Sequence, residues 1–195
     1  MHKFVRVKAV AAPLPLANVD TDMIIPATYM KALTRTGLGK HLFQLLRFAD
    51  DGSERADFIL NQPSCRQAQI LIADRNFGCG SSREHAIWAL TDFGIRCVIA
   101  PSFGDILSGN ARKNGLLLIR LPDALCEALR EEVALAEYAP VEVDLEAQQI
   151  RLASGRTIDF EVDADDRHIL IEGLDDISRT LRHADAIARF EDAAI

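Results

Sequence analysis

The middle of the chain, residues 70–121, alternates apolar strand-like runs with helix-like runs, and this order constrains the fold more than any other feature. Three runs are apolar enough for buried strands: ILIAD (70–74), RCVIA (96–100) and LLLIRL (116–121). Helices are expected between them, one from about Ser82 to Asp92 that Gly94 closes, and one over 102–113 that ends at Asn114-Gly115. Strands that alternate with helices favour a parallel sheet with right-handed crossovers, so the predicted fold class is α/β with a parallel central layer.

β structure is also predicted at both ends of this centre. Residues 4–10 alternate apolar and polar side chains, and 141–152 and 156–162 do the same around Ser154-Gly155, which indicates a flanking β-hairpin. The remaining expectations are partial helix over 26–48, an exposed loop over 49–66, a helix from Asp123 to about Ala136, and a C-terminal helix over 176–192. Without an internal repeat, the chain is interpreted as one domain, 1–195, with its core at about 66–136.

Charge and composition exclude several classes of function. The chain has 22 basic and 29 acidic side chains and a net charge of −7, without a Lys/Arg run, which argues against a nucleic-acid partner. Arg6, Lys8 and two prolines interrupt the N-terminal segment, and no run approaches the roughly 20 apolar residues of a membrane span. A cytoplasmic location without a membrane partner is therefore expected. The four cysteines form no C-x-x-C pair and the five histidines no i, i+4 pair, so neither a disulfide framework nor a metal site of this chain is expected.

The segment DRNFGCGSSREH (74–85) carries the chemistry. It leads from a strand end through two glycines to a helix N-terminus, where free N–H groups and the helix dipole favour an anion. Ser81 and Ser82 lie at the expected cap, and Arg83 offers a planar fork for a carboxylate. The pattern predicts a site for a small dicarboxylate.

Simpler interpretations remain open for the same segment. One serine could act only as the N-cap, with Arg83 at the surface. A dinucleotide site is disfavoured because Arg83 stands where G-x-G-x-x-G needs its third glycine. Cys79 is a candidate nucleophile at a helix N-terminus, and Glu84 and His85 are catalytic by type, although their place in the first turn favours an orienting role.

The chain resembles a known family over nearly its whole length. ADRNFGCGSSREHAIWALTDFGIRCVIAPSF (73–103) is similar to the signature of the aconitase swivelling domain, in the form of bacterial isopropylmalate dehydratase small subunits. Three further segments resemble the same family: NVDTDMIIPATYMK (18–31), TRTGLGKHLFQLLRF (34–48) and GLDDISRTLRHADAIARFE (173–191). The resemblance implies a swivelling β/β/α fold and a step of leucine biosynthesis that interconverts 2- and 3-isopropylmalate by dehydration and rehydration.

The resemblance also implies roles for individual residues. Ser81 would be the base, and Ser82 and Arg83 would bind the substrate. Arg35 and Thr36, in a mobile loop of about 31–48, would read its variable group; a helix-breaking linker is the alternative. Asp22, Glu84 and His85 would orient the site, although Asp22 could instead belong to a simple Asx turn.

A partner follows from the chemistry together with the resemblance. Expelling hydroxide from an unactivated hydroxy acid needs a Lewis acid, for which this chain has no clustered ligands. The resemblance implies a [4Fe–4S] cluster on a separate large subunit, no cofactor on this chain, and no activity of this chain alone.

Other functions remain to be separated from this one. Leu38 stands where many relatives carry an aromatic residue, so citraconate/2-methylmalate or homoaconitate is the alternative substrate. Two alternative functions belong to other classes: a serine hydrolase that uses Ser81 and His85, and a non-catalytic anion-sensing module.

Overall fold

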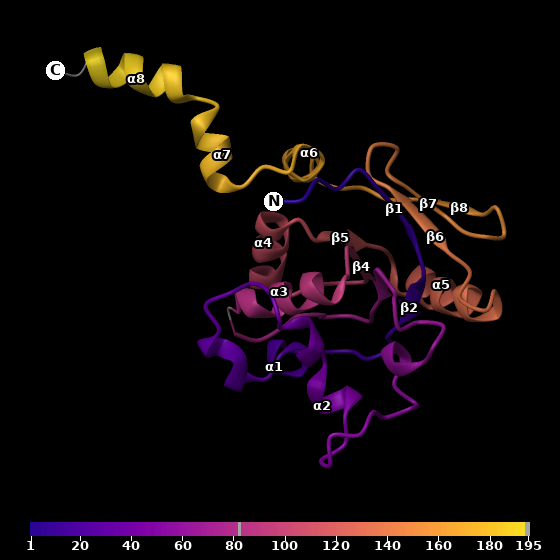
Figure 1. Ribbon diagram of the computed structural model, residues 1–195. Coiled ribbons are helices and arrows are strands. Elements are labelled where there is room, and N and C mark those ends of the chain that lie inside the picture. The colour runs from indigo at the N-terminus through magenta and orange to yellow at the C-terminus, as the bar shows by residue number, and fades with distance from the viewer. Residues whose placement is uncertain (82, 194–195) are drawn as a thin grey trace.

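The computed structural model describes residues 1–81 and 83–193 and contains two four-stranded sheets (Figure 1). One sheet is parallel, with strands in the order β2 (Ala11–Pro13), β3 (Ile70–Ile72), β4 (Cys97–Ala100) and β5 (Leu117–Arg120). In its register Leu71 pairs with Val98, and Val98 pairs with Leu118. The predicted parallel α/β layer is confirmed, but its edge strand β2 comes from the N-terminal segment, directly after the run 4–10, where no further strand was predicted.

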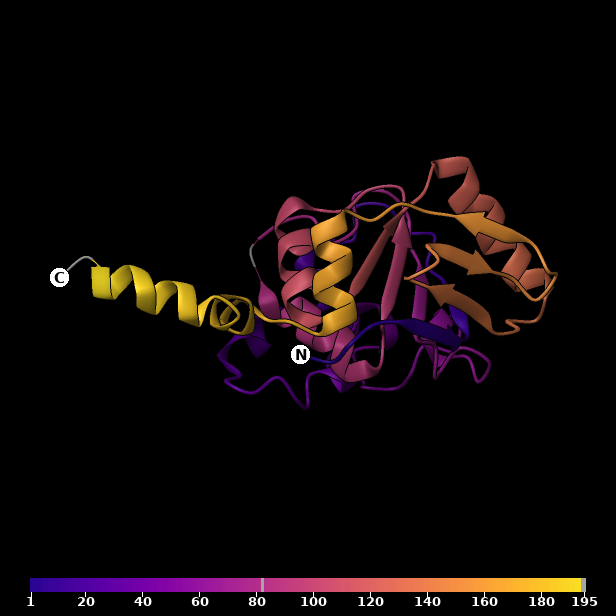
Figure 2. The same cartoon turned by 90° about the horizontal axis from the view of Figure 1, so that it is seen from above.

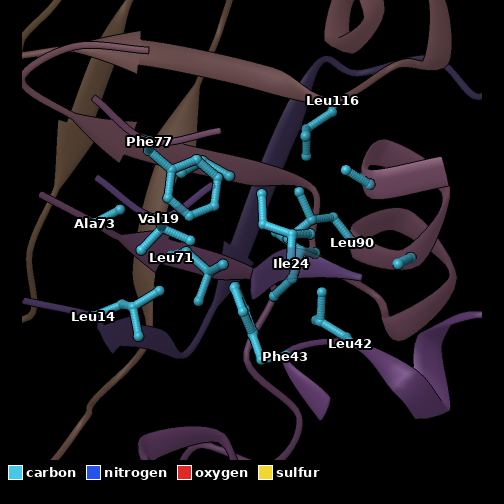
Figure 3. Packing of buried hydrophobic residues seen from close by; sticks show 14 of the residues in the cluster. Leu14, Val19, Ile24, Leu42, Phe43, Leu71, Ala73, Phe77, Leu90 and Leu116 are labelled. Carbon is cyan, nitrogen blue, oxygen red and sulfur yellow. The ribbon is translucent and has the colours of Figure 1, made fainter. Parts of the chain in front are cut away.

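Both faces of the parallel sheet are covered, as its apolar strands require. On one face, Leu71 and Val98 belong to a first core cluster. Four helices pack against it: α1 (Thr21–Ile24), α2 (Gln44–Arg47), α3 (Glu84–Phe93) and α4 (Asp105–Asn114). Figure 3 shows the side chains of this cluster converging, with Leu71, Phe77, Ile24, Phe43 and Leu90 among them. The alternate strand residues Ile70 and Ile72 belong to a second cluster, with α5 (Asp123–Leu135) and the other sheet. Alternate side chains of each strand point to opposite faces of the sheet, so they belong to two separate hydrophobic cores.

The second sheet is antiparallel, with strands in the order β1 (Arg6–Ala9), β6 (Val141–Asp144), β7 (Gln149–Arg151) and β8 (Thr157–Asp159). The hairpin turn at Ser154-Gly155 is confirmed, and Gly155 has φ +87°. The expected single strand 141–152 is wrong, because the chain turns after β6. There the Asp144 carboxylate accepts a hydrogen bond from the Ala147 N–H, an Asx-type turn that ends the strand.

The segment 26–48 contains only short helical turns, with a 3-10 helix at Ala27–Lys31, another at Gly39–His41, and α2. A further 3-10 helix, Ile59–Asn61, lies in the stretch that was expected to be loop only. These turns pack through Leu42, Phe43 and Leu60, each fully buried, so the irregular region is part of the first core. Tertiary packing, rather than helical periodicity, determines its structure.

The C-terminal region differs from expectation in two ways. A helix that was not predicted, α6 (Ala164–Glu172), begins at an Asp163 side chain that caps two N–H groups and ends at Gly173. The expected helix 176–192 is divided into α7 (Asp176–Leu181) and α8 (Ala184–Ala193). Figures 1 and 2 show both extending away from the body, and neither has a buried residue among those described. Within the described ranges, no helix is long and apolar enough to cross a membrane.

Candidate functional site

The loop between β3 and α3 is shaped by its two glycines. Gly78 has φ +71° and Gly80 φ +97°, a region of backbone conformation that side chains disfavour. A Cβ atom on Gly78 would lie 2.5 Å from Leu107 Cδ1, so this glycine is needed for packing against α4. At Gly80 the nearest atom would be Thr21 Oγ1 at 3.5 Å, so only the backbone conformation demands glycine there. At Gly78 the backbone therefore lies close to a core residue of the protein itself.

This glycine loop is joined to the motif 18–22, about 60 residues earlier in the chain. The Gly78 N–H donates to the Val19 carbonyl at 2.6 Å, and the Thr21 N–H donates to the Cys79 carbonyl at 3.0 Å. The Thr21 hydroxyl donates to the Ser81 carbonyl at 3.3 Å. Two motifs that were identified separately in the sequence thus form one structural unit, with Ser81 exposed on it.

The side chain of Arg83 is largely buried, and it pairs with Asp22 of the N-terminal motif. The Arg83 side chain is 12% exposed and donates from Nη1 to the carboxylate of Asp22, which is 50% exposed. Its Nε–H is buried and has no hydrogen-bond partner among the described residues. The interpretation of Arg83 as a surface residue is therefore wrong, and the predicted link between Asp22 and this part of the chain is a direct ion pair.

The start of α3 also differs from the prediction. The helix begins at Glu84, its N-cap is Arg83, and no side chain caps it among the described residues. Ser82, predicted to bind substrate and to begin the helix, lies outside the described residues. Of the residues that the structure describes, Arg83 and not Ser81 is the N-cap. α3 begins shortly after the glycine loop in the chain, and the dipole of the helix favours negative charge at this N-terminus.

The side chains of Glu84 and His85 contact other residues of this chain. Glu84 Oε1 accepts a hydrogen bond from Asn114 Nδ2 at 2.9 Å. His85 Nε2 is 3.1 Å from the Ala32 carbonyl oxygen, and its ring lies 4.6 Å from the Trp88 ring. This geometry ties His85 to the loop that begins at Ala32 and gives it no place beside Ser81 as the base of a hydrolase. The orienting roles expected for both residues fit these contacts.

Arg35 and Thr36 lie in the loop before the 3-10 helix Gly39–His41. Arg35 is 65% exposed, with its guanidinium carbon 5.4 Å from the centre of the Trp88 ring and Nη2 4.0 Å from Glu84 Oε1. Thr36 is exposed, and its carbonyl accepts a hydrogen bond from the Thr34 hydroxyl at 3.3 Å. Leu38 is only 3% exposed and belongs to the first core, so it faces the protein interior rather than the surface that carries Arg35.

The cysteines do not fit a metal cluster. Burial raises the pKa of the Cys65 and Cys97 thiols and raises that of Cys126 to about 11, whereas metal ligation requires thiolates. Cys79 is half-buried in the glycine loop and stands apart from the other three. Among the described residues, no group of three or more His, Cys, Asp or Glu side chains is arranged to hold a metal ion. The four cysteines are therefore not arranged as ligands of an iron–sulfur cluster in the part of the chain that the structure describes.

The site is open to solvent. Ser81, Arg35 and Thr36 are exposed, and two hollows of the molecule lie elsewhere. One, of about 170 Å³, lies between α4, β5 and α6, and the other, of about 460 Å³, lies beside α2. The described side chains can bind a carboxylate, but they form one wall of a site rather than an enclosed pocket.

Some residues in this arrangement were missed by the sequence analysis. Trp88 and Asp92 were assigned only to the first predicted helix, and Asn114 only to the end of the second. In the structure Trp88 and Asp92 contact the loop that carries Arg35, and Asn114 contacts Trp88. The four-residue spacing of Glu84, Trp88 and Asp92 was a detectable signal, because it places them on one helix face. Asn114 had no comparable signal, since its contact crosses between two helices.

Comparison with known proteins gives consistent matches over nearly the whole chain. Residues 1–124 match the family described as Aconitase C-terminal domain, and residues 127–164 match LeuD_N. A 3-isopropylmalate dehydratase small subunit of Granulibacter bethesdensis is 55% identical over 192 residues, which is 98% of this chain and 92% of the relative. One from Gluconacetobacter diazotrophicus is 56% identical over 191 residues, with 98% and 92% coverage. The crystal structure of 3-isopropylmalate dehydratase (leuD) from Methanocaldococcus jannaschii superposes with a TM-score of 0.70 at 27% identity, covering 94% of this chain and 98% of that one.

Proposed function

The chain belongs to the family of 3-isopropylmalate dehydratase small subunits, and on this premise we propose that Arg83 and Ser81 bind and deprotonate the substrate. The activity of the family is that of a hydro-lyase in leucine biosynthesis, so the chain is a subunit of a hydro-lyase in that pathway. The proposal assigns to the chain the interconversion of 2-isopropylmalate and 3-isopropylmalate through a dehydrated intermediate.

The observation that carries the proposal is the largely buried Arg83 side chain, which Asp22 holds in an ion pair. Thr21, the neighbour of Asp22 in the chain, donates a hydrogen bond to the carbonyl of the exposed Ser81. A planar fork in this position suits a carboxylate, and partial burial strengthens the ion pair that it forms. The substrate carboxylate would bind on the part of the guanidinium that Asp22 leaves free. Ser82 would bind a further substrate oxygen.

Ser81 would take the proton from the substrate carbon onto its Oγ and return it in the rehydration step. A serine alkoxide is a very unfavourable species in water, so it needs a local positive field. The N-terminus of α3 and the charge of Arg83 supply a field of that sign. Asp22, Glu84 and His85 would keep Arg83 and the loop with Arg35 in place.

The partner is proposed to be the large subunit that the relatives' name implies. An iron–sulfur cluster on that subunit would act as Lewis acid toward the leaving hydroxyl group. The open wall formed by this chain would then become a closed site only in the complex. Because the family's pathway is an intracellular one, the complex would work in the cytoplasm.

The test is to produce this chain together with its large subunit, record the brown absorbance of an iron–sulfur protein, and follow alkene formation from 3-isopropylmalate. Arg83→Lys keeps the charge and removes the fork, so kcat/KM is expected to fall about 10²-fold. Arg75→Lys, an exposed arginine of the same loop, is the matched control and should retain activity. Unchanged KM and kcat in Arg83→Lys would refute the carboxylate role.

A second measurement concerns the base and the substrate. Ser81→Ala should abolish turnover while the complex still assembles, whereas full activity would mean that this chain is only an anion-binding or scaffolding component. A panel of isopropylmalate, citraconate and homoaconitate separates the proposed substrate from its alternatives.

A further inference from the structure

One face of α3 follows the loop 32–39 along its length. Glu84, Trp88 and Asp92 are spaced four residues apart, which places them in one row on the helix surface. Each of the three contacts this loop, and Arg83 is the N-cap of the same helix. The helix therefore connects the loop with Arg35 and Thr36 to the loop with Ser81.

The exit of the loop is held by Asp92. Its Oδ2 accepts hydrogen bonds from the N–H groups of Gly37 at 2.8 Å and Gly39 at 2.6 Å. A Cβ atom on Gly39 would lie 2.4 Å from the Phe93 backbone nitrogen, so the loop lies directly on the helix backbone. Two hydrogen bonds to one carboxylate are charge-assisted and stronger than neutral ones.

In the middle of the loop, Arg35 contacts two side chains of α3, and a residue of α4 hydrogen-bonds to both of them. Asn114 Nδ2 donates to Glu84 Oε1 at 2.9 Å, and Asn114 Oδ1 accepts from the indole N–H of Trp88 at 3.1 Å. The Arg35 guanidinium lies over that Trp88 ring and faces the same Glu84 oxygen. Asn114 thus fixes both groups that Arg35 contacts, without touching Arg35 itself.

We propose that Asp92 and Asn114 are positioning residues for substrate selectivity, which hold the loop 32–39 in register with the Ser81 loop. This inference rests on the proposed function, in which Arg35 and Thr36 read the variable group of the substrate. Ordering an exposed loop costs backbone entropy, so an isolated loop of this kind would sample many positions. Attachment to α3 sets the distance between the group that reads the isopropyl side chain and the group that binds the carboxylate.

The variants are Asp92→Ala, Asp92→Asn and Asn114→Ala. Asn114 has a matched control on the same helix in Asn110→Ala, because among the described residues only the backbone carbonyl of Asn110, which this variant keeps, forms a hydrogen bond with a side chain. The control for Asp92 is Glu131→Ala, an exposed acidic residue of α5 on the opposite face of the sheet. Asp92→Asn keeps the size of the side chain and one acceptor oxygen, so it replaces the alanine variant in these measurements if Asp92→Ala does not fold.

The first readout uses the chain alone. Amide hydrogen exchange of residues 32–39 is expected to accelerate about tenfold or more in Asp92→Ala, with less effect in Asp92→Asn, as expected when local hydrogen bonds open. Exchange in the strands of the parallel sheet should stay unchanged. An unchanged rate in 32–39 for both Asp92 variants would overturn the proposal.

The second readout uses the complex with the large subunit. The KM for 3-isopropylmalate is expected to rise about tenfold in Asp92→Ala and Asn114→Ala, with kcat within about threefold. Malate has the same two carboxylates without the isopropyl group, and its inhibition constant should stay within about twofold. A merely structural role would lower the active fraction, and therefore kcat, without changing the ratio of these two constants, and that result would overturn the proposal.

The two proposals fail in different ways. If Ser81→Ala and Arg83→Lys remained active, the proposed function itself would be wrong. If those two variants lost activity, while the Asp92 and Asn114 variants kept the KM and the malate constant of the parent, only the positioning role would be wrong.

Discussion

The guanidinium of Arg83 donates a hydrogen bond to the carboxylate of Asp22, a residue 61 positions earlier in the chain. Asp22 belongs to α1 and Arg83 is the N-cap of α3, so the pair joins the N-terminal motif to the glycine loop at the candidate site. The charge of Arg83 is therefore oriented before any substrate binds.

Replacing Asp22 by Asn should destabilise the isolated chain by about 1 kcal/mol, because a guanidinium that is 12% exposed loses its counter-charge while the aspartate side is half exposed. Urea unfolding at neutral pH measures the change. Asp57→Asn, at an exposed aspartate that forms no ion pair with the described residues, is the control. Equal losses in the two variants would show that the ion pair contributes nothing.

Replacing Gly78 by Ala should cost about 2–4 kcal/mol, because the new methyl group meets Leu107 and the backbone has φ +71°. Gly52→Ala separates the two causes, since Gly52 has φ +82° but open space around it, and should cost about 1 kcal/mol. Thermal or urea unfolding of both variants gives the comparison. A Gly52 variant as unstable as the Gly78 variant would mean that steric contact with α4 is unimportant.

Asp144 should make stability depend on acid pH. The pKa of its carboxyl is lowered, first by the hydrogen bond from the Ala147 N–H and then by the nearby Arg6 guanidinium. A lowered folded-state pKa stabilises the protein above the unfolded value of about 3.9, and this contribution is lost as the pH falls through the folded value. The free energy of unfolding should therefore fall less steeply below about pH 4 in Asp144→Asn than in the parent. Parallel pH profiles of the two proteins would contradict this assignment.

Thiol labelling of the native chain should be confined to Cys79. The other three cysteines are buried, and burial raises the pKa of each thiol, so at pH 8 they hold little reactive thiolate. Mass spectrometry after iodoacetamide treatment should find at most one label in the native chain and four after unfolding. The Cys79→Ser variant should take none in the native state. Native labelling at Cys97 would indicate that the parallel sheet opens.

Removing α8 should leave the body of the protein intact. Every described side chain of this helix is exposed, including Phe190 at 75%, so truncation after His183 removes no core contact. The free energy of unfolding should change by less than about 0.5 kcal/mol. A large loss of stability in the isolated chain would show that α8 packs on the body.

The sequence alone was sufficient for the features that depend on local patterns. Three apolar runs separated by two helix-like runs indicated the parallel layer, because buried parallel strands are recognisable without knowledge of their neighbours. The hairpin at Ser154-Gly155 and the placement of Ser81 and Arg83 at a strand-to-helix turn were likewise local. The family resemblance followed from the same segment and was confirmed by the comparisons.

Only the tertiary structure decided which distant segments meet. The backbone of β2 pairs with Ile70–Ile72 in the parallel sheet. A strand of only three residues has no sequence pattern from which this pairing could be predicted. The Asp22–Arg83 pair and the contact of Asn114 with Glu84 join elements that are far apart in sequence, and they form because the packing of α1, α3 and α4 on one sheet face brings the side chains together. Local periodicity is fixed by backbone geometry, whereas the candidate site is made of contacts between elements, which exist only once the core has packed.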